Sequence, residues 1–125
     1  MARQIDTAYL LQEWGVWLRV KAGLPRYVSP SWAIMRECVP GHGGEQPLIS
    51  DEMALLVDSL VCRLYEERRG YREAAVALWH YHRYSGMSYR SLGRLMGITH
   101  VKAQALVERA EAWIDCALCY QAEAA

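Results

Sequence analysis

The spacing of apolar side chains is the feature of this sequence that most restricts its fold. They recur every three or four residues in several segments, and nowhere do they alternate with polar residues over the length of a strand. A helix brings residues three and four apart onto one face, so each of these segments predicts an amphipathic helix. The clearest stripe comprises Met53, Leu56, Val57, Leu60, Val61 and Leu64. The chain is therefore predicted to be all-α.

Residues that begin and end helices divide this pattern into elements. Asp6, Ser50, Ser88 and Thr99 are good N-caps, and glycine follows each of the first four apolar stripes. The predicted helices span residues 6–22, 51–69, 71–84, 89–96 and 100–120. Residues 23–49 hold all four prolines and four of the nine glycines, so this segment is predicted to be irregular, with one short helix over 31–38.

Composition limits the class of protein. The chain has 125 residues, 53% of them hydrophobic, and a formal net charge of zero, which argues against a disordered tail and against a histone-like coat on nucleic acid. Its apolar runs are far shorter than the roughly 18 residues of a membrane-spanning helix. The N-terminus does not resemble a signal peptide, so we expect a single compact domain in the cytoplasm, with its four cysteines as thiols.

The zero net charge conceals two segments of opposite sign. Residues 83–109 carry five basic side chains and one acid, a balance of +4, whereas residues 50–67 carry five acids and one base, a balance of −4. A chain divided in this way can present a basic face to nucleic acid despite its overall neutrality.

The basic segment includes a pattern typical of a helix-turn-helix. Ser88 begins a helix of about two turns, Gly97 ends it, Ile98 plugs the turn, and Thr99 begins the next helix. The residues expected to pack against one another are Leu92, Leu95, Ile98, Val101, Ala105 and Leu106. Those expected to point outward into a DNA major groove are His100, Lys102, Ala103 and Gln104. The alternative is that the capped turn is an ordinary connection and that its charges form a solvated face.

Other candidate sites are weaker. Cys116 and Cys119 have the spacing of a zinc half-site that Cys38 and His42 would complete, but cysteines three apart share a helix face in any case and often pack as small hydrophobes. Cys62 is expected in the core. No nucleophile, base and orienting acid share one segment, and the glycines of residues 41–44 lack the Lys-Ser or Lys-Thr of a phosphate loop. We therefore expect no enzyme activity, no cofactor and no bound metal.

The N-terminal part is rich in aromatic residues. Trp14, Trp17, Tyr27 and Trp32 lie among basic residues, as in a surface that binds protein or RNA. Since a small domain needs large apolar residues in its core, we expect most of them to be buried.

Taken together, the motifs resemble the Q-type antitermination proteins of lambdoid phages. The branch concerned is the one whose helix-turn-helix is similar to the fourth conserved region of sigma factors. The resemblance covers about residues 8–118 and rests on the sequences LLQEWGVW (10–17), GLPRYVSPS (23–31), DEMALLVD (51–58), GMSYRSLGRLMGITHVK (86–102) and EAWID (111–115).

This resemblance implies a function. Such proteins bind double-stranded DNA at a phage late promoter, engage bacterial RNA polymerase that sigma factor holds at a pause, and make it read through terminators. They narrow the RNA-exit channel as a collar through which nascent RNA is threaded. Carried onto this chain, base contacts would come from Thr99, His100, Lys102, Ala103 and Gln104, and phosphate contacts from Ser88, Tyr89, Arg90 and Arg94.

The same resemblance implies a division of labour along the chain. Residues 1–49 would contact the polymerase and its exit channel, chiefly through residues 24–46. Residues 50–125 would form the DNA-binding domain, with the helix-turn-helix at about 88–110. The alternatives are an operator-binding regulator without antitermination activity and a polymerase-binding module without a DNA site.

Overall fold

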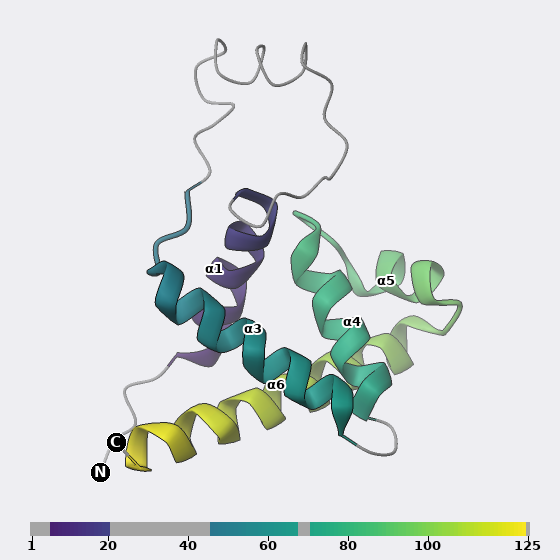
Figure 1. The fold of residues 1–125 in the computed structure, drawn as a ribbon. Coiled ribbons are helices and arrows are strands. Elements are labelled where there is room, and N and C mark those ends of the chain that lie inside the picture. The colour runs from purple at the N-terminus through teal and green to yellow at the C-terminus, as the bar shows by residue number, and fades with distance from the viewer. Residues whose placement is uncertain (1–5, 21–45, 68–70, 125) are drawn as a thin grey trace, which may run out of the picture.

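The computed structural model describes residues 6–20, 46–67 and 71–124. These residues form helices and no strand, which confirms the all-α prediction (Figure 1). The helices are α1 (Thr7–Val20), α3 (Asp51–Glu66), α4 (Tyr71–Arg83), α5 (Tyr89–Met96) and α6 (His100–Ala124). The short helix predicted over 31–38 lies outside the described residues, as does most of the segment 23–49. No described helix is long and apolar enough to cross a membrane.

The four predicted N-caps are confirmed. The side-chain oxygens of Asp6, Ser50, Ser88 and Thr99 each accept a hydrogen bond from the backbone N–H three residues later, at 3.1, 3.1, 3.1 and 3.2 Å. Each bond satisfies an N–H group that the first turn of a helix leaves without a partner. The local sequence thus determines where these helices begin.

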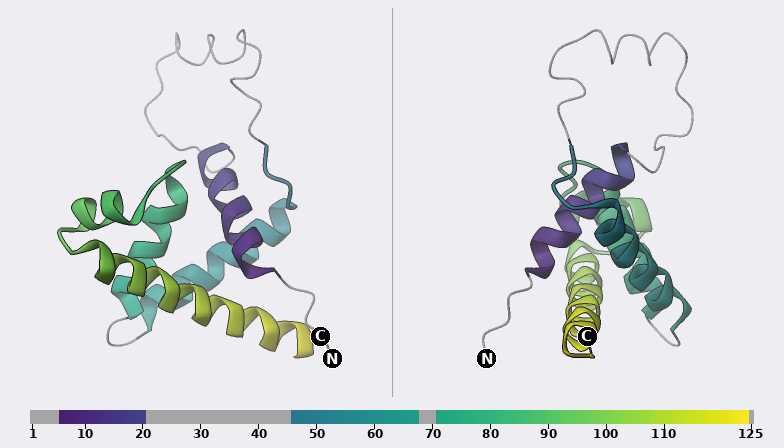
Figure 2. Two further views of the ribbon diagram at one scale, coloured as in Figure 1. Left: turned by 180° about the vertical axis from the view of Figure 1, so that it is seen from behind. Right: turned by 60° about the vertical axis from the view of Figure 1, so that its left-hand side comes forward.

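One core joins all five helices. The long α6 packs against each of the others and runs along the lower edge of the bundle in the left view of Figure 2. The large side chains that are completely buried are Leu11, Trp14, Val57, Leu60, Leu64, Leu78, Leu92, Val107 and Ile114. Met53 was predicted to lie in the core stripe of α3, but it is 36% exposed because it lies in the first turn, at the edge of the bundle.

Helix α1 is attached to α3 by two indole hydrogen bonds. The Trp14 Nε1–H donates to Asp58 Oδ1 at 3.3 Å, and the Trp17 Nε1–H donates to Asp51 Oδ1 at 3.1 Å. Trp14 is completely buried, so its N–H requires an acceptor inside the protein. Two of the five acids of the negative segment therefore hold the N-terminal helix in place.

Two further polar contacts hold α1 in the bundle, one from its middle and one from its first residue. The buried carboxylate of Glu13 accepts a hydrogen bond from the backbone N–H of Leu48 at 2.7 Å, which anchors the chain just before α3. The Thr7 hydroxyl donates to Asp115 Oδ1 of α6 at 2.6 Å. Helix α1 is thus an integral part of the same bundle as α3 and α6.

Helices α1 and α4 approach one another closely at Gly15. A Cβ atom at this position would overlap the carbonyl oxygen of His82, so only glycine allows the contact. The same carbonyl accepts a hydrogen bond from Arg19 Nη1 at 2.8 Å. A cation at the C-terminal end of a helix interacts favourably with the carbonyl groups that have no partner within the helix, so Arg19 stabilises the end of α4.

The imidazole of His82 lies in this contact. It meets the Trp14 ring edge-on, with 6.2 Å between the ring centroids, and its Nε2 is buried without a hydrogen-bond partner. Burial and the nearby charge of Arg19 lower the pKa of His82 to about 4. The folded protein therefore holds a neutral imidazole at pH values where the unfolded chain takes up a proton.

We predict that His82 makes the fold sensitive to acid between about pH 6.5 and pH 4. In this window the unfolded chain binds a proton at His82 and the folded chain does not, so the stability decreases as the pH is lowered, by about 3 kcal/mol in total. Urea unfolding at a series of pH values will measure this slope. His82→Gln should reduce this slope, and the part that remains includes the contribution of His80, whose pKa is also lowered. An unchanged slope in His82→Gln would contradict the assignment.

Candidate nucleic-acid interface

Helices α5 and α6 are joined by a tight turn over residues 97–99. Gly97 adopts a left-handed conformation, with φ of 73° and ψ of 32°, and ends α5 as the sequence predicts. The N–H groups of Gly97 and Ile98 both donate to the carbonyl of Gly93, the latter at 2.9 Å. Thr99 then begins α6, so backbone hydrogen bonds and caps define the whole connection.

Gly93 is essential to this turn and was missed by sequence reasoning. A Cβ atom there would lie 2.7 Å from the carbonyl oxygen of Ile98 and 3.2 Å from the backbone nitrogen of His100. The backbone of the turn can therefore pack directly on α5 only because position 93 lacks a side chain. The available signal was the glycine four residues before Gly97, next to an inward-facing leucine.

The predicted packing within this pair of helices is half correct. Leu92 and Leu106 are buried and Ile98 is partly buried, as expected. Leu95 and Val101, however, are 49% and 66% exposed. The other residue predicted to pack inward, Ala105, is also exposed.

The cause is the direction of the buried face of α6. That face runs through Ala103, Leu106, Val107, Ala110, Ile114 and Leu118. Ala103 is completely buried, so the prediction that it points outward toward DNA is wrong. At about 100° per residue, Val101 lies opposite this face. The outward residues of the first turns are therefore His100, Val101, Lys102, Gln104 and Ala105.

The basic side chains predicted to contact DNA are accessible. Arg90 and Arg94 are exposed on α5, and Lys102 is exposed on the first turn of α6. Lys102 Nζ lies 4.0 Å from Glu73 Oε2 of α4, and Gln104 Nε2 donates to Glu108 Oε2 at 3.0 Å. Both contacts are solvent-exposed and therefore weak, so a phosphate or a base can replace them.

Ser88 and Thr99 use their hydroxyl oxygens as helix caps, as described above. Tyr89 stacks on Tyr81 of α4, with 4.9 Å between ring centroids and 9° between the ring planes. Burial, a hydrogen bond with Tyr81 and the charges of Glu111 and Glu108 raise the pKa of Tyr89 to about 12. These contacts make Tyr89 a link between α4 and α5, and its acidic surroundings do not favour the predicted phosphate contact.

The end of α4 carries a cluster of rings around Arg83. The guanidinium carbon lies 4.4 Å from the centroid of Trp79 and 4.8 Å from that of Tyr84, distances typical of cation–π contacts. His80 stacks parallel to Tyr84. Burial and the charge of Arg83 lower the pKa of His80. The guanidinium group of Arg83 thus already contacts two aromatic rings of the protein.

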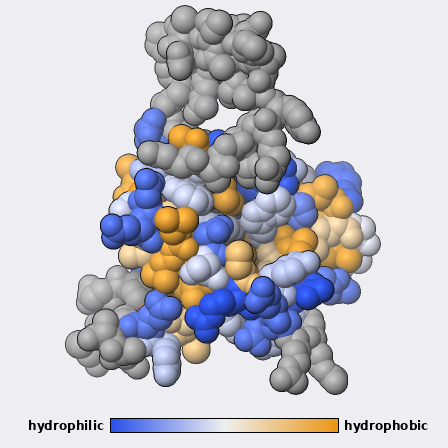
Figure 3. Space-filling model, viewed as in Figure 1, coloured by the Kyte–Doolittle hydropathy of each residue, from blue (hydrophilic) through white to orange (hydrophobic). Residues whose placement is uncertain are grey.

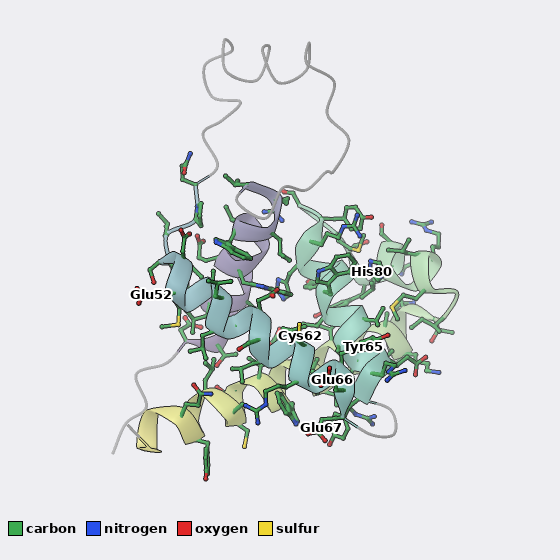
Figure 4. The ribbon with its side chains drawn as sticks, viewed as in Figure 1. Glu52, Cys62, Tyr65, Glu66, Glu67 and His80 are labelled. Carbon is green, nitrogen blue, oxygen red and sulfur yellow. The ribbon has the colours of Figure 1, made fainter. Side chains whose placement is uncertain are left out.

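Negative charge occupies two other regions of the surface. The side chains of Glu52, Glu66 and Glu67 lie near the two ends of α3 (Figure 4). Along α6, a shallow hollow beside the start of α1 includes Glu108, Glu111 and Asp115 in its lining. These acids begin about two and a half turns after Thr99, so the part of α6 that is electrostatically favourable for a polyanion is limited to its first turns.

Of the four residues considered for a zinc site, the structure describes only Cys116 and Cys119. Residues 6–20, 46–67 and 71–124 contain no group of three or more His, Cys, Asp or Glu side chains that could hold a metal ion. Cys38 and His42 lie outside these ranges, and Cys116 is exposed. Cys62 was expected in the core but is exposed; partial burial and the charges of Asp58 and Glu66 raise its pKa.

Comparison with known proteins identifies a family. The family model described as Phage antitermination protein Q matches residues 2–124, nearly the whole chain. No curated protein and no solved structure matches the chain.

We predict different responses at the two glycines of the turn. Gly93→Ala should destabilise the fold by about 2 to 3 kcal/mol, because its Cβ meets backbone, and Gly93→Ser should be no better. Gly97→Ala should cost about 1 kcal/mol through its positive φ alone, and Gly97→Asn should recover most of that, because asparagine tolerates this conformation. Urea unfolding will test this, and a Gly93→Ala variant of normal stability would refute the packing argument.

Proposed function

Because the chain belongs to the phage antitermination protein Q family, we propose that it is the late-gene antitermination factor of a phage or prophage. In this proposal it binds duplex DNA at the late promoter, loads onto paused RNA polymerase and suppresses pausing and termination. The observation that carries the DNA-binding part is the exposed basic surface formed by α5 and the first turns of α6. The family is one of transcription regulators, in keeping with a protein that is not an enzyme.

In this proposal α5 and α6 act as a helix-turn-helix. Arg90, Arg94 and the N-terminus of α5 at Ser88 bind phosphates and set the register on the duplex. The start of α6 enters the major groove, where His100, Lys102 and Gln104 reach base edges and Thr99 lies closest to the backbone. Lys102 and Gln104 exchange their contacts with Glu73 and Glu108 for contacts with DNA.

Polymerase contacts are proposed for the N-terminal part, residues 1–49. The segment 24–46, which is proposed to narrow the RNA-exit channel around the nascent RNA, lies almost entirely outside the described residues. Helix α1, in contrast, contributes Leu11, Trp14 and Leu18 to the same core as the DNA-binding helices. The proposed polymerase-binding and DNA-binding parts are thus coupled through one bundle, so that binding at the promoter positions the N-terminal segment. The protein would act in the cytoplasm of the bacterial host.

Transcription in vitro tests the function itself. The template carries the late promoter, a promoter-proximal pause and an intrinsic terminator, with purified RNA polymerase and sigma factor. We expect the full chain to increase the fraction of transcripts that pass the terminator several-fold, and only when the DNA around the promoter is present. An operator-binding regulator would change the number of initiated transcripts without changing read-through. Equal read-through on a template with unrelated promoter DNA would instead indicate a polymerase-binding module without a DNA site.

Removal of two arginines tests the assigned DNA surface. We expect the double variant Arg90→Gln/Arg94→Gln to bind promoter DNA about 10- to 100-fold more weakly at low salt. The slope of log affinity against log salt should fall by about 2, since each phosphate contact contributes about 0.9. The matched control is Arg63→Gln/Arg72→Gln, which removes two exposed charges from α3 and α4. Equal binding and salt dependence in both double variants would contradict the assignment.

A further inference from the structure

Val101 is an apolar residue in an unexpected place. Its side chain is 66% exposed on the first turn of α6, among the highest values of the large apolar residues that the structure describes. It lies on the side of α6 opposite Ala103, Val107 and Ala110, which are completely buried. None of the helices that the structure describes covers it, so its methyl groups are accessible to a binding partner.

The surroundings of Val101 are cationic and polar. His100 and Lys102 flank it in the sequence and are exposed, and Gln104 follows on the same side of the helix. Across the turn, Leu95 is 49% exposed beside the exposed Arg94. In Figure 3, hydrophobic and hydrophilic side chains likewise lie next to one another over α5. A small apolar spot within a basic surface suits a polyanion that itself carries a small apolar group.

Duplex DNA has one such group in its major groove, the 5-methyl of thymine. We propose that Val101 contacts a thymine methyl and is a specificity-determining residue of this protein; the inference rests on the DNA binding proposed above. Valine suits this task because its branched side chain adopts essentially one rotamer in a helix, so its two methyls are held in place before binding. Ala105, one turn later, is exposed and short, and leaves space for the base edge.

The other residues of this turn already make contacts within the protein. Lys102 and Gln104 must leave Glu73 and Glu108 before they reach a base, and the Thr99 hydroxyl caps α6. Ala103 is buried and cannot take part. Val101 gives up no intramolecular hydrogen bond or ion pair on binding, so its contact adds directly to discrimination between bases.

Replacing single thymines by deoxyuridine tests the proposal, because it removes the methyl group and nothing else from the groove. Duplexes are first enriched from a random 30-bp pool with the full chain, and each thymine of an enriched duplex is then replaced in turn. For the natural protein we expect a loss of affinity of about 3- to 10-fold at one or two thymines, from the lost burial of a methyl group. Val101→Ala should bind the unmodified duplex about 3- to 10-fold more weakly and should show no further loss with deoxyuridine at those positions.

The matched control is Leu55→Ala, which shortens a 54% exposed aliphatic side chain on α3, a helix that does not contact α5. This variant should keep both the affinity and the loss with deoxyuridine. The proposal is overturned if no thymine is sensitive, or if Val101→Ala retains the same loss as the natural protein. Failure to enrich any duplex would overturn it together with the proposed DNA binding. Enrichment of a duplex whose binding does not depend on any thymine methyl would instead overturn the Val101 contact alone and leave the proposed DNA binding intact.

Discussion

The buried face of α6 is the constraint on which both the bundle and its candidate interface depend. This helix packs against every other described helix, and its apolar stripe sets its rotation about its own axis. That rotation places Ala103 inside and Val101 outside. Whatever α6 presents to a partner in its first turns is therefore determined by residues such as Ala110 and Ile114, two and more turns away in the core.

The last turn of α4 contacts both α5 and the N-terminal helix α1. Tyr81 stacks on Tyr89 of α5, while the next residue, His82, meets Trp14, Gly15 and Arg19 of α1. Consecutive residues of one helix thus contact the candidate DNA-binding unit and the N-terminal helix. For a regulator proposed to join a DNA site to RNA polymerase, this arrangement supplies a short and well-packed mechanical link.

The charges of the chain serve two purposes. Asp51 and Asp58 of the acidic segment accept indole hydrogen bonds, and the buried carboxylate of Glu13 anchors the chain before α3, so part of the negative charge stabilises the fold. The basic side chains Arg90 and Arg94 remain exposed on α5. The overall neutrality limits indiscriminate attraction to nucleic acid, which leaves affinity to depend on a local surface.

The sequence alone determined the local features of this protein, whereas the tertiary structure decided which way the side chains face. The caps Asp6, Ser50, Ser88 and Thr99 and the left-handed Gly97 were predictable, because each acts through backbone groups no more than a few residues away. The exposure of Val101, Leu95 and Cys62 was not. A helix with apolar residues on more than one side has several possible buried faces, and only the neighbouring helices select one. The roles of Gly15 and Gly93 likewise required the structure, since the backbone that excludes a side chain there comes from another helix or from a turn.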